Sequence, residues 1–177
     1  MSKPRNILIV GSSGSGKSTL SKKLSQILGL RIINMDHIYW QPGWIMRSQE
    51  EITTLVLSEI EHDGWIFEGN NSITFPQRVA KADMLLWLDL PRETCIWRVI
   101  KRSLKHHGKT RPDMPKGCPE RLNWSFLKWI WNYNKVCRPA LEKLYHETQD
   151  QLERTHLKSA KDVDLFIESM GARLEAV

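Results

Sequence analysis

One eight-residue motif near the start of the chain constrains the fold more than any other feature. Residues 11–18 follow the pattern G-x-x-x-x-G-K-[ST], which is typical of a loop that cradles phosphate groups. An apolar, β-branched run precedes the motif at residues 6–10, and leucine and isoleucine recur at helical spacing after it. Because the motif requires a strand before it and a helix after it, we predict a phosphate-binding loop here. The alternative is a Gly/Ser-rich turn with one exposed lysine.

The chemistry of this loop follows from its residue types. Its glycines let consecutive backbone N–H groups face an anion, and the following helix adds the positive end of its dipole. Lys17 is expected to reach the β- and γ-phosphates of a nucleotide, and the Ser18 hydroxyl is expected to ligate Mg²⁺. ATP and Mg²⁺ are therefore the predicted cofactors. The predicted nucleotide-binding residues are Gly11, Ser12, Ser13, Gly14, Ser15, Gly16, Lys17, Ser18 and Thr19.

Size and composition favour one globular domain over residues 1–177. No apolar stretch approaches the ~20 residues of a membrane-spanning helix, and no signal peptide is visible, so no membrane partner is expected. Three widely spaced cysteines argue against a disulfide framework and suit the reducing cytoplasm. His106, His107 and Cys118 lack a second Cys-x-x-Cys pair, so a structural zinc site is not expected.

Further apolar runs predict the rest of the fold. Residues 31–35, 65–67 and 84–88 form short apolar segments separated by helical patterns, and a weaker strand is expected around 152–157. Nearly continuous apolar strands that alternate with helices indicate a parallel sheet covered on both faces. The predicted fold class is therefore α/β, a three-layer sandwich around a five-stranded parallel sheet.

This chain lacks the sequence signatures of several classes of phosphate-loop protein. A GTPase needs an Asn-Lys-x-Asp guanine reader, and residues 134–137 lack its aspartate. A hydrolytic ATPase commonly ends a strand in Asp-Glu, whereas the apolar strands here end in Glu68-Gly69 and Asp89-Leu90. Asp89 is expected to serve a structural role at a strand–helix turn. A small kinase instead needs an acceptor pocket and a flexible cationic lid that excludes water.

The distribution of charge favours such a lid. The net charge is +6, and nine lysines and arginines crowd residues 92–121. Arg102 and Arg111 bracket a loop rich in Gly, Pro and Lys, so we predict a lid at about residues 102–121 whose arginines neutralise the phosphates. The alternatives are a solvated basic helix face and a surface that binds nucleic acid.

Five further motifs, together with the phosphate loop, resemble the bacterial topology-modulation (FlaR-like) proteins of the adenylate-kinase-like branch of P-loop NTPases. The resemblance runs from about Ile7 to the final helix. The motifs are Met35-Asp36 with Trp40-x-Pro42-Gly43-Trp44, Phe67-Glu68-Gly69-Asn70, Ala82-Asp83 before Leu88-Asp89-Leu90-Pro91, Arg111-Pro112-Asp113, and Cys118-Pro119-Glu120-Arg121.

This resemblance implies a nucleotide-kinase-like sheet in the order 2-3-1-4-5, with ligands at the carboxyl ends of the strands. It implies that Asp36 faces the acceptor or a magnesium-bound water, and that Glu68 is the acidic residue ending the third strand. Arg78 resembles an acceptor-side arginine, but the Asp-Gly-Phe-Pro-Arg run of adenylate kinases is absent, which argues against AMP. Residues 157–161 resemble the segment that packs on adenine.

Each of these residues also has a simpler interpretation. Asp36 and Glu68 could cap turns, since carboxylates are common there. Tyr39, Trp40 and Trp44 could stack on an acceptor or pack the hinge of a lid. By contrast, core and helix packing is expected of three tryptophans, Trp124, Trp129 and Trp131.

The sequence therefore predicts a small ATP-dependent kinase with an acceptor-binding region at about residues 36–62. The candidate catalytic residues are Lys17, Arg102, Arg111, Asp36 and Glu68, and the candidate acceptor-binding residues are Asp36, Tyr39, Trp40, Trp44 and Arg78. The alternatives are a nucleotide-regulated DNA-binding, topology-modulating protein and a hydrolytic NTPase. The sequence predicts neither the acceptor nor the oligomeric state.

Overall fold

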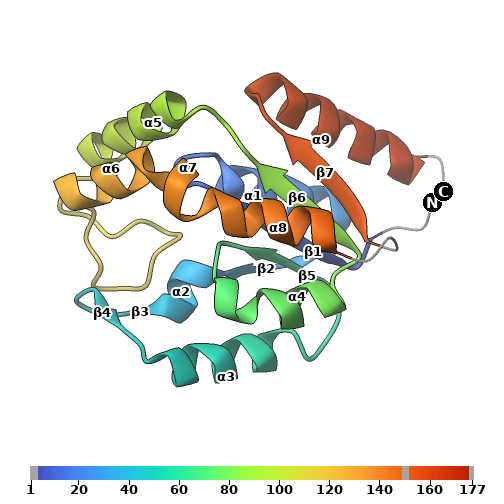
Figure 1. Ribbon diagram of the computed structural model, residues 1–177, viewed down its shortest axis with the longest axis horizontal. Helices are drawn as coiled ribbons and strands as arrows, with labels where there is room; N and C mark the ends of the chain where they lie inside the picture. Colours follow the sequence, from blue (N-terminus) through green and yellow to red (C-terminus); the bar gives the residue numbers. More distant parts are fainter. Residues whose placement is uncertain (1–3, 149–151, 176–177) are drawn as a thin grey trace.

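A computed structural model describes residues 4–148 and 152–175 (Figure 1). The order of strands in its central parallel sheet is β2-β5-β1-β6-β7, which becomes 2-3-1-4-5 when only these strands are numbered along the chain. The predicted α/β class, parallel sheet and strand order are therefore confirmed. The strands are β1 (Asn6–Gly11), β2 (Arg31–Asn34), β5 (Trp65–Glu68), β6 (Met84–Leu88) and β7 (Glu153–Leu157).

Helices cover both faces of this sheet, which gives the three layers (Figure 1). One face packs against α1 (Lys17–Leu28), α5 (Arg92–Lys105), α6 (Trp124–Trp131) and α9 (Ala160–Glu175). The other face packs against α2 (Met35–Tyr39), α3 (Gln49–Glu59), α4 (Phe75–Lys81), α7 (Tyr133–Val136) and α8 (Arg138–Glu147). A short 3-10 helix, η1 (Ser72–Thr74), precedes α4.

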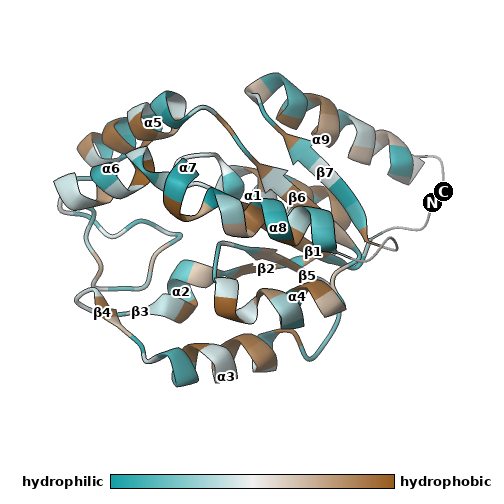
Figure 2. Cartoon of the chain, in the orientation of Figure 1, coloured by the Kyte–Doolittle hydropathy of each residue, from teal (hydrophilic) through white to brown (hydrophobic). Residues whose placement is uncertain are grey.

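The apolar character of β1 explains why two cores form. Ile7 and Ile9 pack into the core on the α1 side, whereas Leu8 and Val10 pack into the core on the α3 side. Successive side chains of a strand point to opposite faces, so a strand buried on both faces must be apolar throughout. Figure 2 shows this as apolar colour along the central strands.

Two elements differ from the sequence-based expectation. The loop after α2 contains a small antiparallel hairpin, β3 (Trp40–Gln41) and β4 (Ile45–Met46), which the sequence pattern did not predict. The expectation that the α6 tryptophans lie in the core is wrong, because Trp124, Trp129 and Trp131 are 77%, 38% and 48% exposed. The reason is that α6 buries its other side, through Leu127 and Ile130.

Within the two described ranges, no helix has both the length and the apolar character that crossing a bilayer requires.

Candidate functional site

The phosphate loop connects the end of β1 to the start of α1 at the carboxyl edge of the sheet. Gly14 has a φ of +81°, and a Cβ atom there would lie 2.3 Å from the carbonyl oxygen of Cys95 in α5. The loop therefore passes too close to α5 for any larger residue at this position. Asn70 fixes the loop from the other side, since its side chain accepts from Gly11 N at 3.1 Å and donates to Gly11 O at 2.9 Å.

Lys17 lies against the phosphate loop itself. Its Nζ donates to the carbonyl oxygens of Gly11 at 3.0 Å and Ser12 at 2.8 Å. Burial lowers the pKa of Lys17, and the nearby Glu68 and Asp36 carboxylates oppose that shift. A lysine held in this way by weak neutral acceptors is ready to exchange them for anionic phosphate oxygens.

Two carboxylates stand opposite Lys17. Glu68 is the last residue of β5, and Asp36 lies in the first turn of α2, directly after β2. Asn34 connects them, because its Nδ2 donates to Glu68 Oε1 at 2.8 Å and its Oδ1 accepts from Asp36 N at 2.8 Å. Burial raises the pKa of both carboxyl groups, and the charge of Lys17 opposes the shift in each.

This arrangement fits a magnesium ion bound together with a nucleotide. Mg²⁺ is usually held by one or two carboxylates plus phosphate oxygens and waters. Ser18, Asp36 and Glu68 all line the same cavity, and the proximity of Ser18 to Glu68 helps to set the Glu68 pKa. The oxygen ligands that the ion prefers are thus gathered beside the phosphate loop.

One cavity of about 920 Å³ extends from these groups to aromatic residues of α2 and the β3–β4 hairpin. The phosphate loop forms one wall, together with α9 residues Ala160, Val163, Asp164 and Ile167. Tyr39, Trp40 and Met46 line the opposite part of the cavity, from α2 and the β3–β4 hairpin. Tyr39 is held in place because its hydroxyl accepts from Asn71 Nδ2 at 2.9 Å.

The predicted lid arginines meet at one buried carboxylate. Glu120 Oε2 lies 2.6 Å from Arg111 Nε and 3.6 Å from Arg102 Nε, and Glu120 Oε1 accepts from Ser103 Oγ at 2.7 Å. Arg111 forms a second ion pair, at 2.6 Å, with Asp113. Both arginines line the cavity, but Arg111 does so with its charge already paired.

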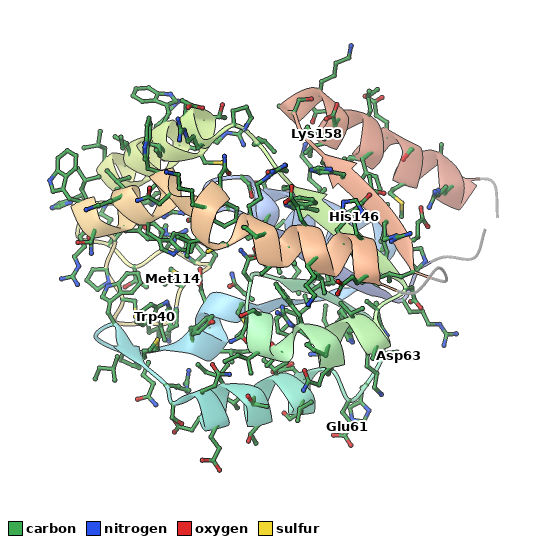
Figure 3. The ribbon with its side chains drawn as sticks, in the orientation of Figure 1. Trp40, Glu61, Asp63, Met114, His146 and Lys158 are labelled. Carbon is green, nitrogen blue, oxygen red and sulfur yellow. The ribbon has the colours of Figure 1, made fainter. Side chains whose placement is uncertain are left out.

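The loop between α5 and α6 also touches the β3–β4 hairpin, which it reaches at the left of Figure 1. Trp44 Nε1 donates to Pro119 O at 3.1 Å, Gly43 N donates to Gly117 O at 2.9 Å, and the Cys118 thiol donates to Gln41 O at 3.3 Å. Trp40 of the hairpin and Met114 of the loop are labelled on this side of the molecule in Figure 3. Trp44 thus lies where the hairpin contacts the loop between α5 and α6, whereas Trp40 lines the cavity.

Arg78 does not lie at the cavity, which corrects its assignment as an acceptor-binding residue. It is fully buried in α4, where its guanidinium donates to the carbonyl oxygens of Gly69 at 2.8 Å and Asn71 at 2.7 Å. The rings of Phe67 and Phe75 each lie 4.8 Å from it. Burial lowers its pKa to about 9. Arg78 therefore holds the loop after β5 in shape, and that loop carries Asn70.

Several cavity residues escaped the sequence analysis. Arg98 in α5 donates to Ser15 O at 3.1 Å and lines the cavity beside the phosphate loop. It belongs to the basic stretch that the sequence shows, but only the packing of α5 reveals which of these cations faces inward. Asn70 belongs to the Phe67-Glu68-Gly69-Asn70 motif, but the sequence predicted no role for it. Other cavity-lining residues without a predicted role are Asn34, Asp113 and Phe126, and Trp129, which was expected in the core, also lines the cavity.

Comparison with known proteins identifies the fold. No family model matches the chain. A shikimate kinase from Acinetobacter baumannii, solved in complex with shikimate, superposes with a TM-score of 0.62 at 19% identity, covering 97% of this chain and 94% of that one. A gluconokinase from Sinorhizobium meliloti superposes with a TM-score of 0.53 at 14% identity, covering 97% and 93%. The fold is thus that of small P-loop kinases.

Similarity to curated protein sequences is weaker, and it covers most of the chain in only one of the three matches described here. The uncharacterized protein YqaC of Bacillus subtilis is 23% identical over 145 residues, which are 81% of this chain and 80% of YqaC. Shorter matches are to the pentafunctional AROM polypeptide of Scheffersomyces stipitis, 33% identical over 61 residues, and to a shikimate kinase of Histophilus somni, 50% identical over 36 residues. These two matches span 34% and 20% of this chain, and only 3% and 21% of the respective relatives.

Proposed function

We propose that this protein is an ATP-dependent phosphotransferase that requires Mg²⁺ and moves the γ-phosphoryl group of ATP to the hydroxyl of a small acceptor. The observation that carries the proposal is the cavity that extends from the phosphate loop to Asp36, Tyr39 and Trp40, a part that we call the acceptor chamber. A nucleotide hydrolase has no need of this additional space. The similar folds of shikimate kinase and gluconokinase support the same conclusion.

The residues of the cavity divide the chemistry between them. The backbone N–H groups of the phosphate loop and Lys17 would bind the β- and γ-phosphates, and Arg98 and Arg102 would add positive charge beside them. Ser18, Asp36 and Glu68 would hold Mg²⁺, which when bound neutralises charge on the phosphates. The Asp36 carboxylate would also orient the acceptor hydroxyl and accept its proton.

The adenine ring is expected beside residues 157–161 and the start of α9. Ala160, Val163 and Ile167 line the cavity there and offer an apolar surface for a base. The region at about 36–62, with α2, the hairpin and α3, would bind the acceptor within one domain spanning the chain. The lid at about 102–121 would exclude water during transfer, and a cytoplasmic location would supply ATP and Mg²⁺.

An acceptor screen tests this proposal. Purified protein with ATP and Mg²⁺ would be offered nucleosides, nucleotides, polyols and hydroxy acids, and labelled products would be separated from phosphate. We expect phosphoryl transfer to at least one hydroxyl compound and a loss of 10²-fold or more in Lys17→Ala, on the order of the effect of removing one group that stabilises the transition state. Lys143→Ala, at an exposed lysine of α8 that does not line the cavity, is the control.

Other outcomes would favour other functions. ATP loss to water alone, unchanged in Lys17→Ala, would contradict the proposal. Salt-sensitive binding to duplex DNA would instead favour the topology-modulating role that the family resemblance suggests, with affinity falling by a log–log slope of about 0.9 per phosphate contacted. Acceptor-independent turnover that requires Lys17 would identify a hydrolytic NTPase.

A further inference from the structure

The charged groups around the acceptor chamber limit what kind of molecule can enter it. Arg111 is only 8% exposed, and its guanidinium lies 2.6 Å from both the Asp113 and the Glu120 carboxylates. Two acidic partners already compensate this single charge. Binding an anionic acceptor through Arg111 would leave at least one of these carboxylates without its cation in a poorly solvated site, which is costly.

Other cations around the chamber also have partners. Arg102 Nε lies 3.6 Å from Glu120 Oε2, and Lys17 and Arg98 both donate to carbonyl oxygens of the phosphate loop. A bound nucleotide would use the charges on that loop. Arg78, the arginine that the sequence suggested for the acceptor, is buried in α4 away from the cavity.

The cations beside the acceptor chamber are matched by carboxylates. Among the described residues, Lys17, Arg102 and Arg111 are grouped with Asp36, Asp113 and Glu120. ATP would add further negative charge even when Mg²⁺ accompanies it. An acceptor with a carboxylate or phosphate group would therefore enter a region of unfavourable potential.

The uncharged wall of the chamber is aromatic. Tyr39 and Trp40 line it, and Trp40 is held by an edge-on contact with Trp44 at a centroid distance of 5.5 Å. Met46 extends this apolar surface. Rings in this arrangement offer their faces to a flat or apolar part of a ligand, while Asn34 and Asp36 provide hydrogen-bonding groups for hydroxyls.

We infer that the acceptor is an uncharged or cationic hydroxyl compound with a ring or apolar face, and that acids and phosphate esters are excluded by the pairing of Arg111 with Asp113 and Glu120. This inference rests on the proposed function, since it assigns the substrate class of the same site. On this inference, the acceptor chamber differs in ligand preference from the site of an enzyme that selects a hydroxy acid.

The test measures binding and does not need turnover. Protein saturated with Mg²⁺ and a non-hydrolysable ATP analogue, which fills the γ-phosphate position, would be titrated calorimetrically with matched probes that differ in charge. The pairs are D-glucitol with D-gluconate, and cytidine with cytidine 5′-monophosphate. In the wild-type protein we expect each anionic member to bind at least about tenfold more weakly than a neutral partner that binds.

The decisive comparison uses two variants with the same change in charge. Asp113→Asn removes one partner of Arg111, whereas Glu50→Gln neutralises an exposed carboxylate of α3 that does not line the cavity and serves as the control. We expect Asp113→Asn to bind D-gluconate or the monophosphate at least about tenfold more tightly than the wild type does, and Glu50→Gln to show no gain. Retained binding of the ATP analogue would verify that both variants are folded.

Two results would overturn the inference: tighter binding of an anionic probe than of its neutral partner by the wild type, or no gain of anion binding in Asp113→Asn. Failure of the kinase proposal is a separate result, because it would be seen as absent Lys17-dependent transfer while these binding differences persist.

Discussion

At the scale of single residues, glycine at position 14 is the strictest requirement of the phosphate loop. Its φ of +81° belongs to the left-handed region, and the carbonyl oxygen of Cys95 occupies the space where a Cβ atom would lie. Gly29, which ends α1, has a similar φ of +71° but open space around its Cα. The two positions therefore separate the cost of backbone strain from the cost of a steric collision.

We expect Gly14→Ala to lower the free energy of unfolding by about 2–4 kcal/mol, because strain and overpacking add. Gly29→Ala should cost only about 1–2 kcal/mol, since strain acts alone there. Urea unfolding of both variants measures the difference. Equal losses would show that the contact between the phosphate loop and α5 is looser than the structure indicates.

A single buried carboxyl group is also expected to affect how the stability of the protein depends on pH. Burial raises the pKa of Glu68, and Lys17 only partly opposes the shift. A carboxyl group whose pKa is raised by folding binds protons more tightly in the folded than in the unfolded protein. The free energy of unfolding therefore falls as the pH rises from the ordinary carboxylate value to the raised one.

Glu68→Gln cannot ionise, so we expect it to lose this decrease and to gain stability relative to the wild type as the pH rises. Urea unfolding at several values between about pH 4 and 8 would show a growing difference between the two proteins. Glu61→Gln, at the exposed carboxylate labelled in Figure 3, is the matched control for the same substitution at the surface. A Glu68→Gln protein that follows the wild-type curve would contradict the assigned direction of the pKa shift.

At the scale of elements, the β3–β4 hairpin and the loop between α5 and α6 both line the cavity and contact each other. Their contacts join residues more than 70 positions apart, among them Trp44 Nε1 with Pro119 O and the Cys118 thiol with Gln41 O. Neither segment has much regular structure of its own. We therefore expect each segment to depend on the other for its position beside the cavity.

Trp44→Ala should loosen the loop between α5 and α6, which is the predicted lid. Loss of this contact is expected to shift the lid toward an open state by about 1–2 kcal/mol, which raises tryptic cleavage at the exposed lysines Lys109 and Lys116 about 5- to 30-fold. Mass spectrometry of the fragments locates the cuts. Trp124→Ala, at an exposed tryptophan of α6, is the matched control and should leave the cleavage rate unchanged. Equal effects of both variants would mean that Trp44 does not hold the lid.

At the scale of the whole molecule, the parallel sheet explains why one edge gathers the chemistry. The carboxyl ends of β2, β5 and β1 deliver Asn34, Glu68 and the phosphate loop to neighbouring positions. Ligands of open α/β sheets bind outside these strand ends. The structural similarity to shikimate kinase and gluconokinase, at 19% and 14% identity, extends over nearly the whole chain and therefore concerns this framework.

The sequence by itself determined the phosphate loop, the five strands of the parallel sheet and the edge at which Asp36 and Glu68 gather, because these depend on local periodicity and on which residue follows a strand. Only the tertiary structure decided that Arg78 is buried while Arg98 faces the cavity, and that Arg111 is paired with Asp113 and Glu120. All are arginines in helical or loop segments, and composition does not tell them apart. Their roles depend on which surfaces pack together, and such contacts between distant segments leave no periodic pattern in the chain.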